Sequence, residues 1–247
     1  MTIGLGFVSR SGVVLAADRQ HTVQGVYKYE RKLRLCAYPS CAVGSTFANL
    51  PNLANILNDR VHAHIQRFKK ARSEALVGVI RDETRKLFSE YPIEMAQQEF
   101  LWAIGTTDEA ARLVRVAGGI VDEPHSACIG VGDSSLVRYL MTQTARIPFV
   151  YWTLAEVVRF AIYVTKQAKG FVDGVGGQTD VLTITRKDEY DLLSGAVCEA
   201  FDSDFVELQD AFEMLYNIWT NSTIDNEDRL RLISNLEDFL KKNRCQK

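Results

Sequence analysis

Apolar and polar positions follow two different periods along the first 190 residues of the chain. Short apolar runs of the length typical of strands predict β-structure at residues 3–9, 13–18, 33–36, 41–43, 99–106, 111–117, 126–132 and 181–185. Apolar residues recurring every three or four positions predict helices over 48–68, 73–90, 134–144 and 153–171. Residues 19–30 are polar and follow neither period, and we expect them to be irregular.

The order of these elements is informative about the fold class. Strands precede two helices, strands return, two more helices follow, and a late strand ends the series. This order is typical of an α+β domain, with two stacked antiparallel sheets between helical layers, and we place it over residues 1–190. Helical spacing resumes over 203–219 and 225–242. We therefore predict a helical C-terminal extension over 191–247, packed either on the core or at a subunit interface.

Composition and charge exclude several classes of protein. Of 247 residues, 47% are apolar, which is enough for a large core, and the formal net charge of −2 gives no basis for nucleic-acid binding. We expect no membrane span, no secretory signal, no metal site and no organic cofactor. The five cysteines fit no zinc-binding spacing, so reduced thiols and a cytoplasmic location are expected.

The opening residues carry the candidate chemistry. Initiator methionine is usually removed ahead of a small residue, which would leave Thr2 as the first residue with a free α-amino group. That amine titrates near neutral pH and can take the proton of the neighbouring hydroxyl, a known variant of nucleophile activation. If 3–9 and 13–18 form a hairpin, Asp18 comes to lie beside Thr2. Lys32 is then within reach of both, and Lys28 and Arg31 remain alternatives.

The combination of these segments resembles the start of a proteasome β-type subunit and its bacterial homologues, which are N-terminal-nucleophile hydrolases. The resemblance rests on TIGLGFVSRSGVVLAADRQHT at 2–22, RKLRL at 31–35 and AVGSTFANL at 42–50, with weaker echoes in IGVGDS at 129–134 and DGVGGQTDVLTI at 173–184. The matched positions are Thr2, Gly12, Ala16, Ala17, Asp18, Thr22, Lys32, Gly44 and Ser45.

The resemblance implies a four-layer αββα sandwich and peptide-bond hydrolysis by a threonine protease. Thr2 would be the nucleophile, with its own amine as the base and with Asp18 and Lys32 tuning it. Gly44 would donate its backbone N–H to the oxyanion. Thr22 and Ser45 would belong to the same oxyanion and substrate-binding region. The implied partners are a peptide or unfolded protein, other copies of the chain in a ring, and an ATP-dependent unfoldase, which the sequence leaves open.

The sequence also departs from this pattern. Val131 and Val175 stand where the family has serines that support the amino terminus, and Asp173 is one residue nearer the Gly-Gly pair than the family aspartate. Ser134 and Asp173 are candidates to take over that supporting role. These departures keep two alternatives open, namely a catalytically inactive structural subunit of the same fold and a narrow-specificity amidase or transpeptidase.

Overall fold

The structure is a computed structural model that describes residues 2–23, 26–130, 135–143 and 147–201, with 227, 228, 230, 231 and 234. The chain divides into two compact units, Met1–Glu199 and Ala200–Lys247. The helix predicted over 203–219 and most of that over 225–242 lie outside the described residues. The first unit contains the candidate site.

Two five-stranded sheets form the centre of this unit, and all their neighbouring strands are antiparallel. The first sheet contains, in spatial order, β10 (Ser126–Gly130), β1 (Ile3–Val8), β2 (Val13–Asp18), β11 (Thr179–Arg186) and β12 (Glu189–Leu193). The second contains β5 (Arg34–Tyr38), β6 (Cys41–Ala48), β7 (Glu99–Thr106), β8 (Arg112–Ala117) and β9 (Ile120–Asp122). The predicted α+β class with antiparallel sheets is confirmed.

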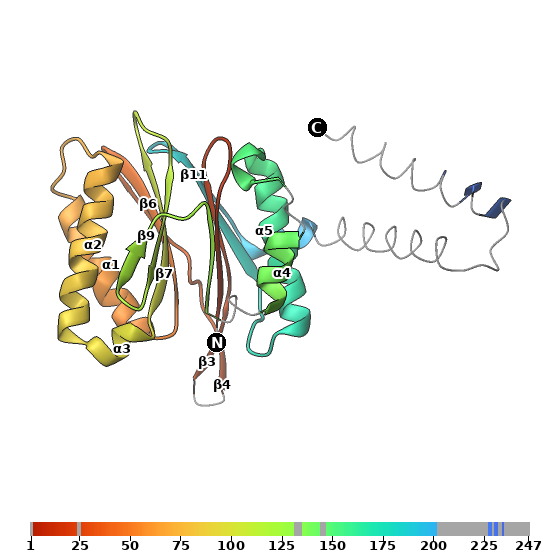
Figure 1. The fold of residues 1–247 in the computed structure, drawn as a ribbon, viewed down its shortest axis with the longest axis horizontal. Coiled ribbons are helices and arrows are strands. Elements are labelled where there is room, and N and C mark those ends of the chain that lie inside the picture. The colour runs from red at the N-terminus through yellow and green to blue at the C-terminus, as the bar shows by residue number, and fades with distance from the viewer. Residues whose placement is uncertain are drawn as a thin grey trace. The chain divides into compact units, whose positions relative to one another are not determined.

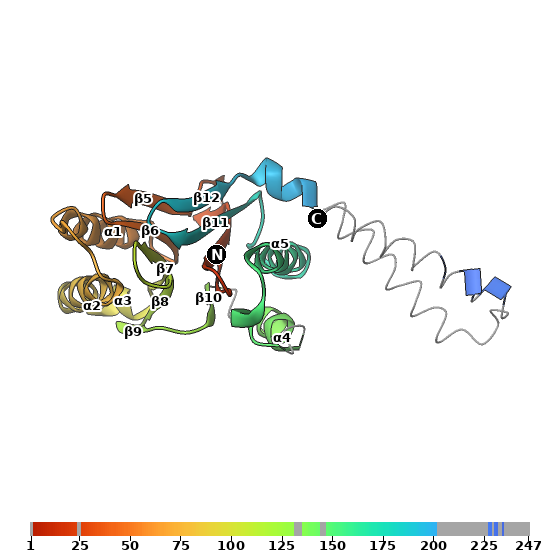
Figure 2. The ribbon, with the colours of Figure 1, turned by 90° about the horizontal axis from the view of Figure 1, so that it is seen from above.

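Helices lie on the outer side of each sheet (Figures 1 and 2). The helices beside the second sheet are α1 (Pro51–Ile65), α2 (Ser73–Glu90) and the short α3 (Pro92–Ala96). Those beside the first sheet are α4 (Ser135–Gln143) and α5 (Leu154–Phe171), preceded by the 3₁₀ turn η2 (Phe149–Tyr151). A capping box fixes the start of α5, because Thr153 and Glu156 each bond the other's backbone N–H.

Strand alternation divides the core into two apolar layers. Along β7, one set of side chains packs toward the helices and the other toward the first sheet, as a period of two requires. The first set is Phe100, Trp102 and Ile104, and the second is Leu101 and Ala103. All five are fully buried. Burial on both faces explains why the sequence shows β7 as a continuous apolar run.

The structure differs from the sequence prediction in several places. Residues predicted to be irregular form a separate hairpin of β3 (Gln20–Val23) and β4 (Val26–Tyr29). Its Tyr27, Lys28 and Tyr29 are exposed, so no buried stripe marked it in the sequence. The helix predicted from residue 48 begins at Pro51, because β6 continues to Ala48. At the other end of the domain, β12 runs across the predicted boundary at 190 and pairs with β11.

No helix among the described residues is both long enough and apolar enough to cross a membrane.

Candidate active site around Asp18 and Lys32

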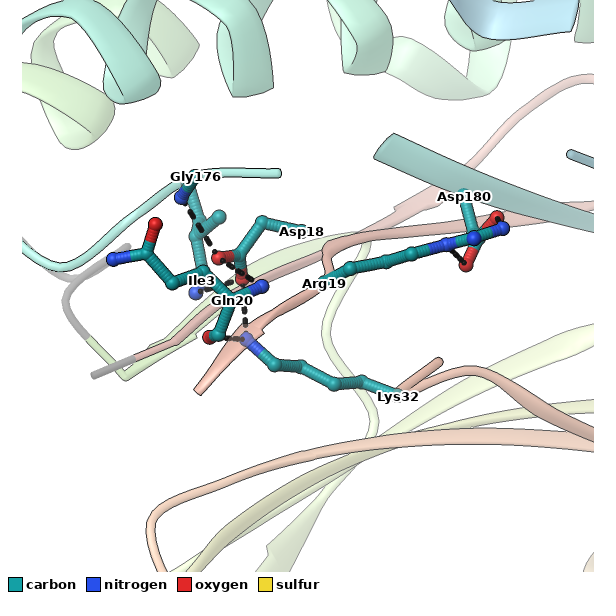
Figure 3. Close-up of polar contacts among 7 residues, drawn as sticks. All are labelled: Ile3, Asp18, Arg19, Gln20, Lys32, Gly176 and Asp180. Carbon is teal, nitrogen blue, oxygen red and sulfur yellow. Dashed lines mark hydrogen bonds and ion pairs between the residues drawn. The ribbon is translucent and has the colours of Figure 1, made fainter. Parts of the chain in front are cut away.

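The hairpin of β1 and β2 brings Asp18 to the amino terminus of the fold. The register pairs Gly4 with Ala17, so the end of β2 lies beside the start of β1. Oδ1 of Asp18 accepts a hydrogen bond from the backbone N–H of Ile3 at 3.0 Å (Figure 3). The residue that follows Thr2 is therefore fixed directly to this carboxylate, which is fully buried.

Lys32 forms an ion pair with the same carboxylate oxygen. Its Nζ lies 2.7 Å from Oδ1 of Asp18, and both side chains have an exposed fraction of zero. The ammonium also donates to the backbone carbonyl of Gln20 (Figure 3). Burial lowers the pKa of Lys32 from its ordinary value, while the charge of Asp18 opposes that change. A lysine held in this balance is sensitive to any change in its surroundings.

The second oxygen of Asp18 is held by backbone groups. Oδ2 accepts the N–H of Gln20 at 3.2 Å and that of Gly176 at 3.1 Å (Figure 3). With Ile3 and Lys32, four donors converge on one carboxylate. Such a carboxylate is held in one orientation.

The structure resolves the choice among the three basic residues. Lys28 and Arg31 are exposed, and the guanidinium of Arg31 lies 3.6 Å from Asp180. Lys32 is the one that reaches Asp18.

Thr2 itself is 4% exposed and lies against Gly130 at the end of β10. A Cβ atom at Gly130 would come within 2.2 Å of the Thr2 carbonyl oxygen and 3.0 Å of the Ala48 side chain. Gly130 also has a φ of 69°, a conformation that L side chains rarely adopt. The contact therefore requires glycine at this position, and it places Thr2 near the end of β6.

The structure does not bring Gly44 to Thr2. Gly44 lies within β6, four residues before Ala48, which corresponds to about 13 Å along a strand. A Cβ there would lie 2.2 Å from the side chain of Leu182, so this glycine allows the two sheets to approach closely. Ser45 donates to Asn58 of α1 at 2.7 Å and is thus part of the helix packing.

Three further predicted residues are placed with different outcomes. Thr22 pairs with Tyr27 in the hairpin of β3 and β4, and its side chain lies outside the described residues. Ser134 also lies outside the described residues, as does Val131. Asp173 is exposed in the turn after α5. From that same segment, the group that reaches Asp18 is the backbone N–H of Gly176, next to the buried Val175.

Two neighbours of the site were not assigned to it from the sequence. Asp180, near the start of β11, forms a bidentate pair with Arg19 at 2.8 and 2.6 Å (Figure 3). His21 is buried with its ring 6.0 Å from that of Phe47. Burial, followed by the charge of Lys32, lowers the pKa of His21. His21 is three residues from Asp18, so its nearness to the site could be found from the sequence. Asp180 reaches it through the pairing of β11 with β2, which no local signal predicts.

Chemically, the site is a buried ion pair packed against the backbone of the second and third residues. Among the described residues, no group of three or more His, Cys, Asp or Glu side chains is arranged to hold a metal ion. The arrangement can fix an ammonium group close to the start of β1, directly after Thr2. Because both side chains of the pair are fully buried, the ammonium group is shielded from solvent.

Comparison with known proteins gave structural matches alone, since no family model and no curated protein matches the sequence. The structure is similar to the Gly-1 mutant of Anbu from Hyphomicrobium sp. strain MC1, with a TM-score of 0.72 and 17% identity over 92% of this chain and 99% of that one. Anbu from Yersinia bercovieri, described as an ancestral beta-subunit, gives a TM-score of 0.66 and 12% identity over 84% and 97%. A helical assembly of the Anbu complex from Pseudomonas aeruginosa gives 0.64 and 13% over 84% and 95%.

These matches correct the resemblance drawn from the sequence. The structural neighbours are Anbu proteins, which are related to the proteasome without being canonical proteasome β subunits. The prediction of a proteasome β-type subunit or its bacterial homologue is therefore wrong. At this level of identity the comparison shows the fold alone, which is that of the Anbu proteins named above.

Proposed function

We propose that this chain is a threonine-type N-terminal-nucleophile hydrolase with an αββα sandwich, and that it cleaves peptide bonds through Thr2 after Met1 is removed. The observation that carries the proposal is the fully buried pair of Asp18 and Lys32 against the backbone N–H of Ile3. A buried ion pair adds little stability compared with apolar packing, so its presence next to a candidate nucleophile favours a functional role.

The reaction would proceed in two steps at Thr2. The hydroxyl passes its proton to the α-amino group as Oγ1 bonds to the scissile carbonyl carbon and the carbonyl electron pair moves to oxygen. Collapse of this adduct breaks the C–N bond, and the leaving amine takes the proton, which leaves an ester on Thr2. Water then attacks the ester through the same base, releasing the acid and restoring the hydroxyl. Lys32 lowers the energy of the developing negative charge, and Asp18 keeps Lys32 protonated.

The backbone at the end of β6 replaces Gly44 in this proposal. The register partners in β5 stop at Ser45, whereas β6 continues to Ala48 beside Thr2. An extended peptide can add to this edge of β6. The backbone N–H groups at the end of β6 are then candidate donors to the oxyanion. Assembly of several copies is part of the proposal, because the Pseudomonas aeruginosa neighbour is a helical assembly.

The test uses a covalent probe directed at N-terminal threonine, together with intact mass. Loss of Met1 and labelling of the wild type and of Thr2→Ser are expected, whereas Thr2→Ala and the nearly isosteric Thr2→Val should neither be labelled nor hydrolyse peptides. All three substituted residues are small enough for Met1 removal. Hydrolysis that survives in Thr2→Val would overturn the assignment. A peptide library then separates broad proteolysis from a narrow amidase.

One observation favours a second candidate, a catalytically inactive structural subunit. Where the family pattern has supporting polar groups, this chain has a buried valine at 175 and an exposed aspartate at 173. Under this alternative, Met1 is retained or the probe leaves the wild type unlabelled.

A further inference from the structure

Glu99 connects the two sheets at the end of the fold where Thr2 lies. It is the first residue of β7, and its register partner is Ala48 at the end of β6. Its Oε2 accepts the backbone N–H of Gly130, the last residue of β10, at 2.6 Å. A carboxylate of the second sheet therefore holds a strand end of the first.

Through Gly130, this carboxylate acts on the amino terminus. Gly130 pairs with Ile3 in the first sheet and packs against the carbonyl oxygen of Thr2. The contact is tight enough that no Cβ would fit at Gly130. Because the Glu99 carboxylate accepts the N–H of Gly130, a shift of that carboxylate would also move Gly130, against which Thr2 packs.

The Glu99 carboxylate is one of the charged groups at the end of the fold where the Thr2 amine lies. Removal of Met1 creates an ammonium group on Thr2, which packs against Gly130, and a nearby anion stabilises such a charge. The described titratable groups near it are Asp18 from β2, Lys32 before β5, His21 from β3 and Glu99 from β7. Asp18 already accepts from four donors, one of them the Lys32 ammonium. Among the described residues, Glu99 supplies a second carboxylate at this end of the fold.

We propose that Glu99 is a positioning residue for the Thr2 nucleophile, which holds Gly130 against Thr2 and balances the charge of the new terminal ammonium. This inference rests on the proposed function, since it concerns the same amino group. It assigns to β7 a supporting role that the sequence analysis placed on Ser134 and Asp173. A nearby negative charge raises the pKa of an amine by about 1 unit or more, so Glu99 would raise the pH at which the amine becomes an active base.

The experiment measures that pH directly. The rate at which an N-hydroxysuccinimide ester acylates the Thr2 amine is followed against pH by the mass of tryptic peptide 2–10, which contains no lysine. In Glu99→Gln the midpoint should fall by about 1 pH unit, and the acid limb of kcat/KM should fall with it. Glu99→Asp, which keeps the charge on a shorter side chain, should keep the midpoint and lower kcat. Glu123→Gln, an exposed glutamate paired with Arg112, is the matched control and should change neither.

The outcomes separate this inference from the proposed function. An unchanged midpoint in Glu99→Gln overturns the role of Glu99 even if hydrolysis continues. A lowered midpoint without hydrolysis in the wild type supports Glu99 and contradicts the proposed function. Retention of Met1 overturns both. If Glu99→Gln does not fold, Glu99→Asp decides, because the role of Glu99 requires an unchanged midpoint together with a lower kcat. An unchanged kcat or a lowered midpoint in Glu99→Asp would overturn it.

Discussion

Two buried aspartates lie side by side in the first sheet, and their ion pairs differ in kind. Asp18 ends β2, and Asp180 lies in β11 opposite Ala17. Lys32, the partner of Asp18, is fully buried, whereas Arg19, the partner of Asp180, has 23% of its side chain exposed. Burial lowers the pKa of Lys32, but the hydrogen bonds that Arg19 donates to Asp180 raise the pKa of Arg19. The same kind of contact thus accompanies opposite pKa shifts of the two basic side chains, because both side chains are fully buried only in the Lys32 pair.

This difference separates the expected roles of the two pairs. The Arg19 pair is bidentate and its guanidinium remains partly hydrated, which suits a tie between the end of β2 and β11. The Lys32 pair bears the full cost of removing two charges from water. Asp18 of this pair also accepts the backbone N–H of Ile3. The costly burial of the pair therefore occurs next to Thr2, where the proposed reaction needs a fixed ammonium group.

The largest effect is expected from breaking the dry pair. Asp18→Asn or Lys32→Met leaves one buried charge without its partner and should lower the free energy of unfolding by about 3–5 kcal/mol. Peptide hydrolysis should fall by about 10²-fold or more, since the ammonium is lost or misplaced. Chemical denaturation and initial rates measure the two effects.

A double variant shows which of the two effects is functional. Asp18→Leu with Lys32→Met replaces the pair by apolar side chains, and it should recover much of the stability while remaining inactive. If the double variant hydrolyses peptides at the wild-type rate, the pair has no part in the reaction.

A smaller effect is expected from the glycine that supports Thr2. Gly130→Ala adds a Cβ that meets the Thr2 carbonyl, and kcat should fall by about 10²-fold because the nucleophile is displaced. Gly118→Ala is the matched control, since Gly118 also has a positive φ but its added Cβ meets nothing closer than 3.6 Å. Both variants should lose about 1–2 kcal/mol to backbone strain. Equal activity in the two variants would contradict the contact with Thr2.

The same contrast shows how far the sequence could predict the site. The hairpin signal placed Asp18 beside Thr2 because an antiparallel register follows from two adjacent apolar runs and a short turn. The sequence favoured Lys32 but left Lys28 and Arg31 as alternatives, because the exposed hairpin of β3 and β4 that precedes Lys32 carries no buried period. The contacts of Gly176 with Asp18 and of Glu99 with Gly130 join segments far apart in the sequence. Gly44 was expected at the oxyanion site but lies inside β6, where it allows the two sheets to pack closely. A glycine in that role cannot be told from the sequence apart from a glycine at a strand end.

Breaking the hydrated pair should have a modest effect. Asp180→Asn removes the charge that Arg19 binds, but the guanidinium can turn to water, so a loss of about 1–3 kcal/mol is expected. Because Asp180 does not contact Thr2 or Lys32 through any described hydrogen bond, kcat should change little. A loss of activity as large as that of Asp18→Asn, measured at equal folded fraction, would show that the two pairs act as one unit.

The smallest effect concerns pH and leaves the chain unchanged. Burial lowers the pKa of Lys32 below 10.5, so between the lowered pKa and 10.5 the folded protein has lost a proton that the unfolded chain still binds. In that window, the contribution of Lys32 to the free energy of unfolding rises with pH, whereas hydrolysis falls because the ammonium is lost. Denaturation of the wild type relative to Lys32→Met should show the rise, and Lys32→Arg, which stays charged, should not. If stability and activity fell together through the window, Lys32 would not be the group that titrates, and the alkaline loss of activity would reflect unfolding instead.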